Sequence, residues 1–403
     1  MNAGRRSRGA EHQSEAGTDE ASIIETPPLA LYVHVPWCVA KCPYCDFNSH
    51  VVPGVVPERD YCRALLADLD FELALRPARE PVETVFFGGG TPSLLAPATI
   101  ADVLAALGRR LNFAADVEIT LEANPGTIER GRFGEYRAAG INRVSLGVQS
   151  FDDAMLKRLG RIHDAREAIA AVEELQSAGI ENFNLDLMHG LPGQSAAGAL
   201  ADVRQAIALA PAHLSYYELT LEPGTAFYRR PPRLPAEPAL AAIERAGREG
   251  IAAAGYLRYE VSAHARPGRR CRHNDNYWRY GDYIGIGPGA HGKRSGRAGV
   301  LRTERIRSPA RWLRLAGDAQ AVTLRAVDPA ERAFEFMLGA LRRSEGFDWG
   351  EFEARTGCSR ETVLAPVRQA LADGLMEADG PYLRASARGL VFLNDLQARF
   401  LPV

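Results

Sequence analysis

Three cysteines, Cys38, Cys42 and Cys45, lie close together near the start of the chain with the spacing C-x3-C-x2-C. Three thiolates on one short loop can bind three irons of a [4Fe-4S] cube and leave the fourth iron without a protein ligand. A structural zinc ion would need a fourth ligand, which His34 or His50 could supply, but zinc sites usually pair two C-x2-C arms and the chain has no second pair. The spacing therefore predicts an iron-sulfur cluster.

Further polar residues and glycines follow short apolar segments along the chain. Each stands where a predicted strand ends, and the carboxyl ends of parallel strands meet on one rim, where α/β folds place their active sites. We therefore expect these residues to converge with the cysteines on one site. They are Gly88, Gly89, Gly90, Thr91, Glu122, Gln149, Ser150, Asp186 and His189.

The apolar segments alternate with helical stretches rich in Ala, Leu, Arg and Glu. This alternation predicts six βα units, and strands that are apolar on both faces predict a parallel sheet with right-handed crossovers. We predict an α/β fold whose residues 28–265 form a partial (β/α)6 barrel of the TIM type, with a doubly wound sheet as the alternative. The six predicted strands are residues 30–35, 83–89, 117–123, 142–148, 182–188 and 213–219.

Three other regions flank the predicted barrel. Residues 1–27 are expected to be a disordered tail, and residues 266–328 a glycine-rich loop and connecting segment. Residues 329–403 are predicted to be mostly helical with one terminal hairpin, which resembles a winged helix. A DNA-binding role for this C-terminal domain is disfavoured, because residues 331–403 hold nine arginines against eleven carboxylates.

Composition narrows the class of protein. The 403 residues are 46% hydrophobic and 24% charged, with a net charge of -2, which argues against nucleic acid as a partner. The sequence shows neither an apolar run long enough for a transmembrane segment nor a hydrophobic signal core. The six cysteines, three clustered and three isolated, do not form the pattern of a disulfide framework. We therefore expect a protein of the reducing cytoplasm.

The motifs together resemble the radical S-adenosylmethionine (radical SAM) superfamily, and within it the oxygen-independent coproporphyrinogen III oxidase family. The resemblance runs from about residue 30 to the C-terminus and is carried by YVHVP before C-x3-C-x-Y-C, then GGGTP, LEANPG, GVQSF, GRIH and DLMHGLPGQ. It implies that Cys38, Cys42 and Cys45 bind a [4Fe-4S] cluster whose open iron is chelated by S-adenosylmethionine. The implied S-adenosylmethionine contacts are Tyr32, Gly89, Gly90, Thr91, Glu122, Gln149, Arg161 and Asp186.

One position departs from the oxidase pattern. Coproporphyrinogen oxidases of that family carry a further cysteine two residues after the third cluster ligand, and Phe47 stands there in this chain. A phenylalanine neither binds iron nor acts as a thiol. Oxidative decarboxylation of coproporphyrinogen III to protoporphyrinogen IX by a 5′-deoxyadenosyl radical is therefore the alternative function, and cleavage of S-adenosylmethionine on this scaffold stays open.

The sequence H-N-x-x-Y-W at residues 273–278 is similar to the signature of a haem-chaperone subfamily. The imidazole of His273 could coordinate haem iron, and Tyr277 and Trp278 offer flat apolar surfaces against a porphyrin. Cys271 is an alternative ligand or a covalent attachment point. The same aromatic and glycine residues could instead only pack the mouth of the barrel.

That resemblance implies the main functional prediction. We expect a protein that binds haem and transfers it to apo haemoproteins, in particular respiratory enzymes, and that reaches the membrane only through these clients. His291 is a second candidate for the iron ligand, and Arg272 or Arg279 could bind the propionates.

Overall fold

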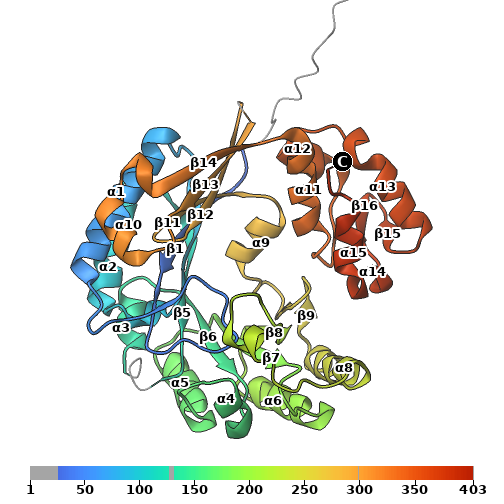
Figure 1. The fold of residues 1–403 in the computed structure, drawn as a ribbon, viewed down its shortest axis with the longest axis horizontal. Helices are drawn as coiled ribbons and strands as arrows, with labels where there is room; N and C mark the ends of the chain where they lie inside the picture. The colour runs from blue at the N-terminus through green and yellow to red at the C-terminus, as the bar shows by residue number, and fades with distance from the viewer. Residues whose placement is uncertain (1–25, 127–130, 298, 403) are drawn as a thin grey trace, which may run out of the picture.

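The computed structural model describes residues 26–126, 131–297 and 299–402, so nearly all of the expected tail lies outside the described residues. Within these ranges one sheet has twelve strands, and six consecutive ones are parallel and neighbour one another in chain order (Figure 1). The predicted α/β fold with an open six-stranded barrel is confirmed. The six strands are β1 (Leu29–Val35), β4 (Val82–Gly89), β5 (Phe113–Ala123), β6 (Arg143–Gln149), β7 (Phe183–His189) and β8 (His213–Glu218).

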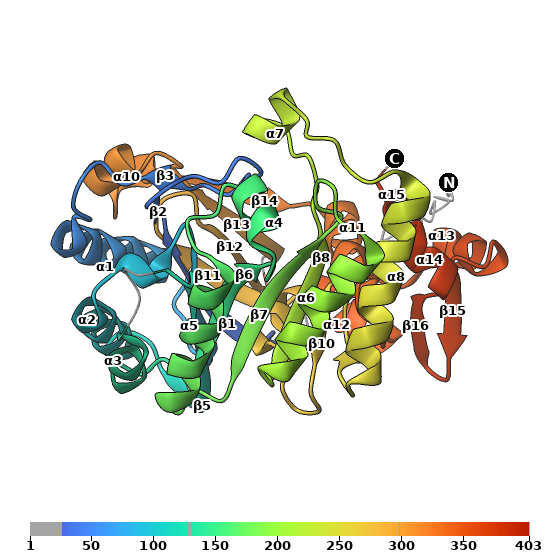
Figure 2. The ribbon, with the colours of Figure 1, turned by 90° about the horizontal axis from the view of Figure 1, so that it is seen from below.

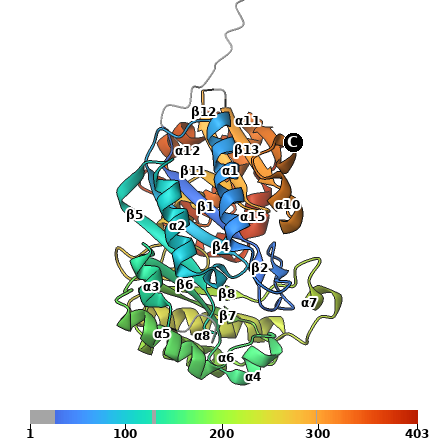
Figure 3. The ribbon, with the colours of Figure 1, turned by 90° about the vertical axis from the view of Figure 1, so that its left-hand side faces the viewer.

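Helices follow the outer, convex side of this sheet (Figures 1 and 3). They bury one apolar stripe each, as in the second helix after β6, where Ala168, Val172 and Leu175 are buried and a capping box of Asp164 and Glu167 fixes the first turn. The main core forms where these stripes meet the outward residues of the strands. The helices are α1 (Glu58–Leu75), α2 (Pro97–Gly108), α3 (Phe133–Ala138), α5 (Ala165–Ser177), α6 (Ala196–Ala208) and α8 (Glu237–Ala253).

The glycine-rich segment that was expected to be a connecting loop forms regular structure. Helix α9 (Arg272–Trp278) holds the H-N-x-x-Y-W sequence. Four strands then extend the sheet beyond β1: β11 (Asp282–Ile286) runs parallel to β1, and β12 (His291–Gly296), β13 (Gly299–Arg305) and β14 (Val322–Val327) continue antiparallel. A Cβ at Gly285 would lie 1.8 Å from the carbonyl oxygen of His291, so the glycine lets β12 approach β11.

The rest of the sheet and its rim are completed by short elements. Strands β10 (Ala263–Ala265) and β9 (Leu257–Arg258) pair antiparallel beyond β8. At the carboxyl ends of the parallel strands, the short pair of β2 (Trp37–Cys38) and β3 (His50–Val51) lies at the same rim as α7 (Ala226–Arg229) (Figure 2). The backbone N–H of Phe227 donates to the carbonyl of Pro43, 2.9 Å away, and joins the two segments.

The C-terminal domain has three helices, a hairpin and two short helices. It is mostly helical with one hairpin, as predicted, but the hairpin is not terminal, because two helices follow it. It has a core of its own, in which Phe336 meets Phe347 and Phe352 edge to face. Its first helix packs on α9, where a Cβ at Gly339 would come within 2.8 Å of the Trp278 carbonyl. Its elements are α11 (Pro329–Ala340), α12 (Trp349–Thr356), α13 (Glu361–Ala372), β15 (Met376–Asp379), β16 (Tyr382–Ala385), α14 (Ala387–Val391) and α15 (Leu393–Ala398). Across the described residues, no helix has the length and hydrophobicity needed to span a membrane.

Candidate functional site

The three clustered cysteines lie on the loop that leaves β1. Pairing of β2 with β3 closes this loop at its ends, and the Cys45 N–H donates to the Cys42 carbonyl within it (3.2 Å). All three thiols are free of disulfides and line one cavity of about 340 Å³, which we call the cluster cavity.

Each of the three thiols has a polar neighbour in the cluster cavity. The hydroxyl of Thr91 donates to Cys38 Sγ (3.5 Å), and Arg161 Nη1 donates to Cys42 Sγ (3.6 Å). Cys45 Sγ lies 3.5 Å from the hydroxyl oxygen of Ser49. Burial raises the pKa of the Cys38 thiol, so the sulfur needs such donors, or a metal, to ionise. Three unpaired cysteines with cationic and hydroxyl donors at the sulfurs fit a cluster held by three thiolates.

Two glycines at the end of β4 let the cluster loop close against the sheet. The N–H groups of Gly90 and Thr91 donate to the carbonyls of Val35 and Trp37, both at 2.7 Å. A Cβ at Gly90 would lie 2.5 Å from the Trp37 carbonyl oxygen, and Gly89 has φ +116°. Side chains are therefore excluded at these two positions.

Two half-buried carboxylates face the same cavity from β5 and β7. Glu122 accepts from the Gly89 N–H (3.0 Å), and Asp186 accepts from Asn184 Nδ2 (2.8 Å) and Ser145 Oγ (3.3 Å). Burial, and then the charge of Asp186, raises the pKa of Glu122 to about 7, and burial also raises the pKa of Asp186. A ligand that brings hydroxyl groups or an ammonium to these carboxylates would stabilise their ionised forms and so offset the effect of burial.

Arg161 and Gln149 complete the wall beside Cys42. Arg161 Nη2 donates to the Gly147 carbonyl (2.8 Å) and to the Asn124 side chain, which fixes the guanidinium between the cysteine and β6. Gln149 has φ +70°, a strained value for a residue with a side chain, and its Oε1 accepts from Tyr217 (2.7 Å). The arrangement can hold a carboxylate-bearing ligand next to a cluster.

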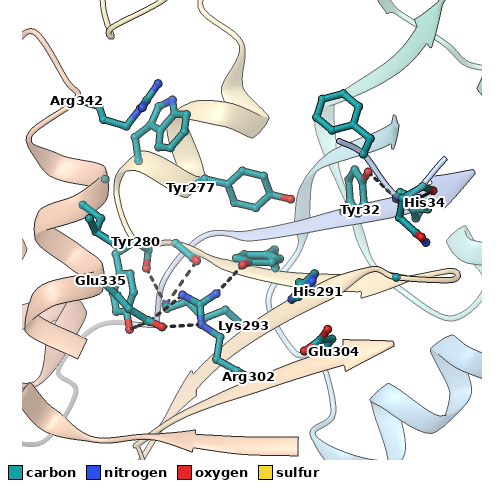
Figure 4. A pocket seen from close by; sticks show the side chains of 18 of the residues that line it. Tyr32, His34, Tyr277, Tyr280, His291, Lys293, Arg302, Glu304, Glu335 and Arg342 are labelled. Atoms are coloured by element: carbon teal, nitrogen blue, oxygen red, sulfur yellow. Dashed lines mark hydrogen bonds and ion pairs between the residues drawn. The ribbon is translucent and has the colours of Figure 1, made fainter. Parts of the chain in front are cut away.

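A second cavity of about 750 Å³ opens between the added strands β11–β13, helix α9 and the C-terminal domain (Figure 4). We call it the interdomain cavity. Its charged lining includes Lys293, Arg302, Arg307, Arg342, Glu304 and Glu335. Its aromatic lining consists of Tyr32, Phe47, Tyr277, Trp278, Tyr280 and Tyr283.

Helix α9 presents only part of the H-N-x-x-Y-W sequence to this cavity. His273 is 1% exposed, its Nδ1 pairs with the Thr84 hydroxyl (2.8 Å) and its Nε2 with the Tyr277 hydroxyl (2.9 Å). Its ring also stacks on Phe86, with centroids 4.9 Å apart. Burial, and then the charge of Arg143, lowers the pKa of His273 to about 3. Both ring nitrogens are therefore engaged in this structure.

The other candidates on this segment are also engaged. Cys271 is buried, its pKa is raised to about 11 mainly by burial, and neither it nor His273 belongs to the described lining of either cavity. Arg272 pairs with Asp116 (3.1 Å) and Arg279 with Glu351 (2.8 Å). Of residues 271–279, Tyr277 and Trp278 are the two that line the interdomain cavity.

Comparison with known proteins agrees with this geometry. The sequence model of the radical SAM superfamily matches residues 32–206, and that of the HemN C-terminal domain matches residues 327–392. A protein of Escherichia coli K12 named "Heme chaperone HemW" is 48% identical over 380 residues, which cover 94% of this chain and 100% of that protein. The chain belongs to the HemW family.

Other relatives widen this family relationship. A mouse protein named "Radical S-adenosyl methionine domain-containing protein 1, mitochondrial" is 38% identical over 395 residues, 93% of this chain and 87% of that protein. The solved structure of the Escherichia coli coproporphyrinogen III oxidase HemN, a radical SAM enzyme, aligns with a TM-score of 0.79 at 22% identity over 94% of this chain and 92% of that one. At that identity the likeness concerns the fold alone.

Membership of the HemW family, and with it of the radical SAM superfamily, implies a [4Fe-4S] cluster and S-adenosylmethionine. The structure brings the expected cluster cysteines together with most of the expected S-adenosylmethionine contacts. It places Tyr32 elsewhere: this side chain lines the interdomain cavity, and its hydroxyl pairs with Nδ1 of His34 (3.0 Å). Around the cluster cavity are Cys38, Cys42, Cys45, Gly89, Gly90, Thr91, Glu122, Gln149, Arg161 and Asp186.

Sequence reasoning missed several lining residues of this HemW-family chain. Asn124 accepts a hydrogen bond from Arg161. Tyr217 donates one to Gln149, and Ser145 donates one to Asp186. Asn124 and Tyr217 lie at the carboxyl ends of β5 and β8, the same strand-end position that singled out the other residues, whereas Ser145 lies within β6 and has no such signal.

Proposed function

We propose that this protein binds haem and transfers it to apo haemoproteins, among them respiratory enzymes at the membrane. The observation that carries the proposal is the interdomain cavity. Its volume of about 750 Å³ lies within the range of about 300–1,000 Å³ usual for sites of small molecules and cofactors. Flat aromatic side chains on its walls suit a porphyrin, and guanidinium groups suit propionates. The name carried by the bacterial relatives supports the same function.

We also propose that Cys38, Cys42 and Cys45 hold the [4Fe-4S] cluster, with S-adenosylmethionine on the glycines and carboxylates of the cluster cavity. A reduced cluster of this kind can supply the electron that cleaves bound S-adenosylmethionine. In this chain Arg161 is placed to bind the methionine carboxylate, and Glu122 to accept from hydroxyl groups. The two carboxylates at β5 and β7 therefore orient the ligand.

The cluster loop is physically joined to the interdomain cavity. Phe47 lines both cavities, and Asn48, which lines the interdomain cavity, donates through Nδ2 to the carbonyls of Pro288 (2.8 Å) and Arg307 (3.0 Å). A cluster that fixes the positions of the three cysteines would also fix Phe47 and Asn48. We propose that the cluster serves haem transfer by ordering this shared wall.

The alternative function is that of an oxygen-independent coproporphyrinogen III oxidase. The complete set of glycines, carboxylates and Arg161 at the cluster cavity favours it, because S-adenosylmethionine could be positioned there for cleavage. Phe47 disfavours it, because it stands where those oxidases carry a further cysteine. Anaerobic incubation of the reconstituted protein with S-adenosylmethionine, a reductant and coproporphyrinogen III separates the two: the oxidase forms protoporphyrinogen IX at steady turnover, and the proposed carrier does not.

The transfer step has its own test. Protein loaded with one equivalent of haem is mixed with an excess of an apo-cytochrome, and the spectrum of the acceptor is followed after the two proteins are separated. The proposal expects the acceptor to gain haem faster than from free haemin at the same concentration. Retention of the haem by this protein, or transfer no faster than from free haemin, would overturn the carrier function.

A further inference from the structure

We infer that His291, on β12, is the side chain that coordinates haem iron in the interdomain cavity. This inference rests on the proposed function and deepens it by naming the ligand. It departs from the expectation that the histidine of the H-N-x-x-Y-W sequence fills that role. Three observations support it: the hydrogen bonds of the histidines near the cavity, the face of the sheet on which His291 lies, and the charged side chains around that face.

Three histidines lie at or just behind this cavity, and two are already engaged. His273 uses Nδ1 for Thr84 and Nε2 for Tyr277. His34 uses Nδ1 for the Tyr32 hydroxyl and Nε2 for the Asn48 carbonyl, both at 3.0 Å, and it is buried. His291 is exposed, lines the cavity and has no side-chain hydrogen bond to any residue in the described part of the chain. Its nitrogens are thus available to a metal without loss of a protein contact.

His291 projects from the sheet side of the cavity. Side chains alternate along a strand, so His291 and Lys293 share one face of β12, and both line the cavity. Tyr277 comes from α9 on the opposite wall, and Figure 4 shows the two side chains separated across the open space. Tyr277 packs edge to face on Tyr283, with ring centroids 4.5 Å apart. A porphyrin bound to His291 would therefore have an aromatic wall on its other face.

The cations of the cavity differ in how far they are already paired. Arg302 pairs with Glu335 (2.8 Å), and Arg342 pairs with Glu260 (3.0 Å) while its guanidinium covers the Trp278 ring at 4.5 Å. Arg307 is exposed and has no carboxylate within ion-pair distance among the described residues. It is therefore the guanidinium best placed to take a propionate.

A carboxylate also faces the proposed ligand. Glu304 lies directly opposite His291 in the β12–β13 ladder, where the Cβ atoms of paired residues are about 4.5–5.5 Å apart. It is placed to accept from the ring nitrogen that does not bind iron, and such a partner makes an imidazole a stronger donor to the metal. Glu304 would then act as a positioning residue. Glu304→Gln should keep the Soret position and raise the reduction potential of the bound haem.

The test compares haemin titrations of the wild-type protein and single variants, all with a reconstituted cluster. Difference spectra against the same protein without haemin remove the cluster absorption. His291→Ala should shift the Soret band and weaken haemin binding at least tenfold, and added imidazole should restore the wild-type spectrum. Gln320→Ala, at an exposed side chain outside both cavities, is the control and should bind as wild type. Arg307→Ala should weaken binding several-fold without a spectral shift, and Arg311→Ala should not.

The outcomes separate this inference from the function on which it rests. If the wild-type protein fails to bind haemin, the proposed function is wrong. If the wild type binds and His291→Ala retains both its spectrum and its affinity, the function stands and His291 is not the ligand. Because His291 is exposed, its variant is expected to fold, and unchanged cluster content and melting temperature check this.

Discussion

The hydroxyl of Tyr277 lies 2.9 Å from Nε2 of His273, and of the two side chains only the tyrosine lines the interdomain cavity. The histidine is anchored from behind by Thr84 of β4 and by the ring of Phe86. Within the H-N-x-x-Y-W sequence, His273 therefore has a support role: it positions Tyr277, which forms part of the aromatic wall of the cavity. This relationship determines the first two predictions.

Tyr277→Phe should destabilise the protein and keep the coordination of haem. The change leaves Nε2 of buried His273 without its partner, and an unsatisfied buried group costs about 1–3 kcal/mol of unfolding free energy. Denaturant unfolding measures this loss. Tyr228→Phe is the control, because Tyr228 is 53% exposed and its loss of a hydroxyl should change stability little. A Soret shift in Tyr277→Phe equal to that of His291→Ala would contradict the support role.

The buried imidazole of His273 should make stability depend on pH in acid. Burial, and then Arg143, lowers its pKa to about 3, whereas an unfolded histidine has a pKa of about 6.5. Between these values the unfolded chain binds a proton that the folded protein excludes, so stability falls as the pH falls through this window and is unaffected above it. From pH 7 to pH 5 the wild type should lose about 1–2 kcal/mol more than His273→Gln. Equal losses in the two proteins would show that His273 is protonated or exposed when folded.

Cys42→Ala should remove the cluster while the fold persists. The thiol is only half-buried, and its loss leaves two thiolates for the cube. After anaerobic reconstitution, bound iron and sulfide should fall to the background of a chain without the cluster. Cys62→Ala, which changes a thiol outside both cavities, should bind as much iron as the wild type. Full iron and sulfide in Cys42→Ala would exclude Cys42 as a ligand.

Glu122 should make the binding of S-adenosylmethionine depend on pH near neutrality. Its pKa is raised to about 7, mainly by burial, and its ionised form is the better acceptor for hydroxyl or ammonium groups. Affinity for S-adenosylmethionine should therefore rise as the pH increases through 7 in the wild type. Glu122→Gln should bind about tenfold more weakly at pH 8 and lack this rise, because a carboxylate bond worth over 1 kcal/mol is lost. Calorimetric titration of the reconstituted protein measures both, with the exposed Glu181→Gln as control. If the affinity of Glu122→Gln rises with pH in the same way, another group causes the pH dependence.

Much of the barrel and of the cluster site could be predicted because their signals are local. The parallel strands are continuous apolar runs, and the three cysteines fall on one loop. The strands added beyond β1 carry no such signal. Strand β12, for example, consists of HGKRSG and buries Lys293, which forms an ion pair with Asp282 at 3.0 Å. That ion pair joins β12 to β11, and the pattern of hydrophobic residues in the two strands does not predict it.

The haem-facing residues could be predicted only in part for a related reason. Tyr277 and Trp278 were identified as aromatic surfaces, and both line the cavity. The surroundings of His273 depend on β4, far away in the chain, whose Thr84 engages the imidazole. Which face of an element points to a cavity depends on such distant contacts, and a short motif does not encode them.

The most direct measurement of the central claim is the position of iron in crystals of the reconstituted, haem-loaded protein, located by anomalous scattering at the iron absorption edge. The account predicts two separate sites. One lies among Cys38, Cys42 and Cys45 at the cluster cavity, and the other lies in the interdomain cavity within coordination distance of the His291 imidazole. A haem iron beside Cys271 or His273, or iron at the cluster cavity alone in crystals that retain haem, would contradict it.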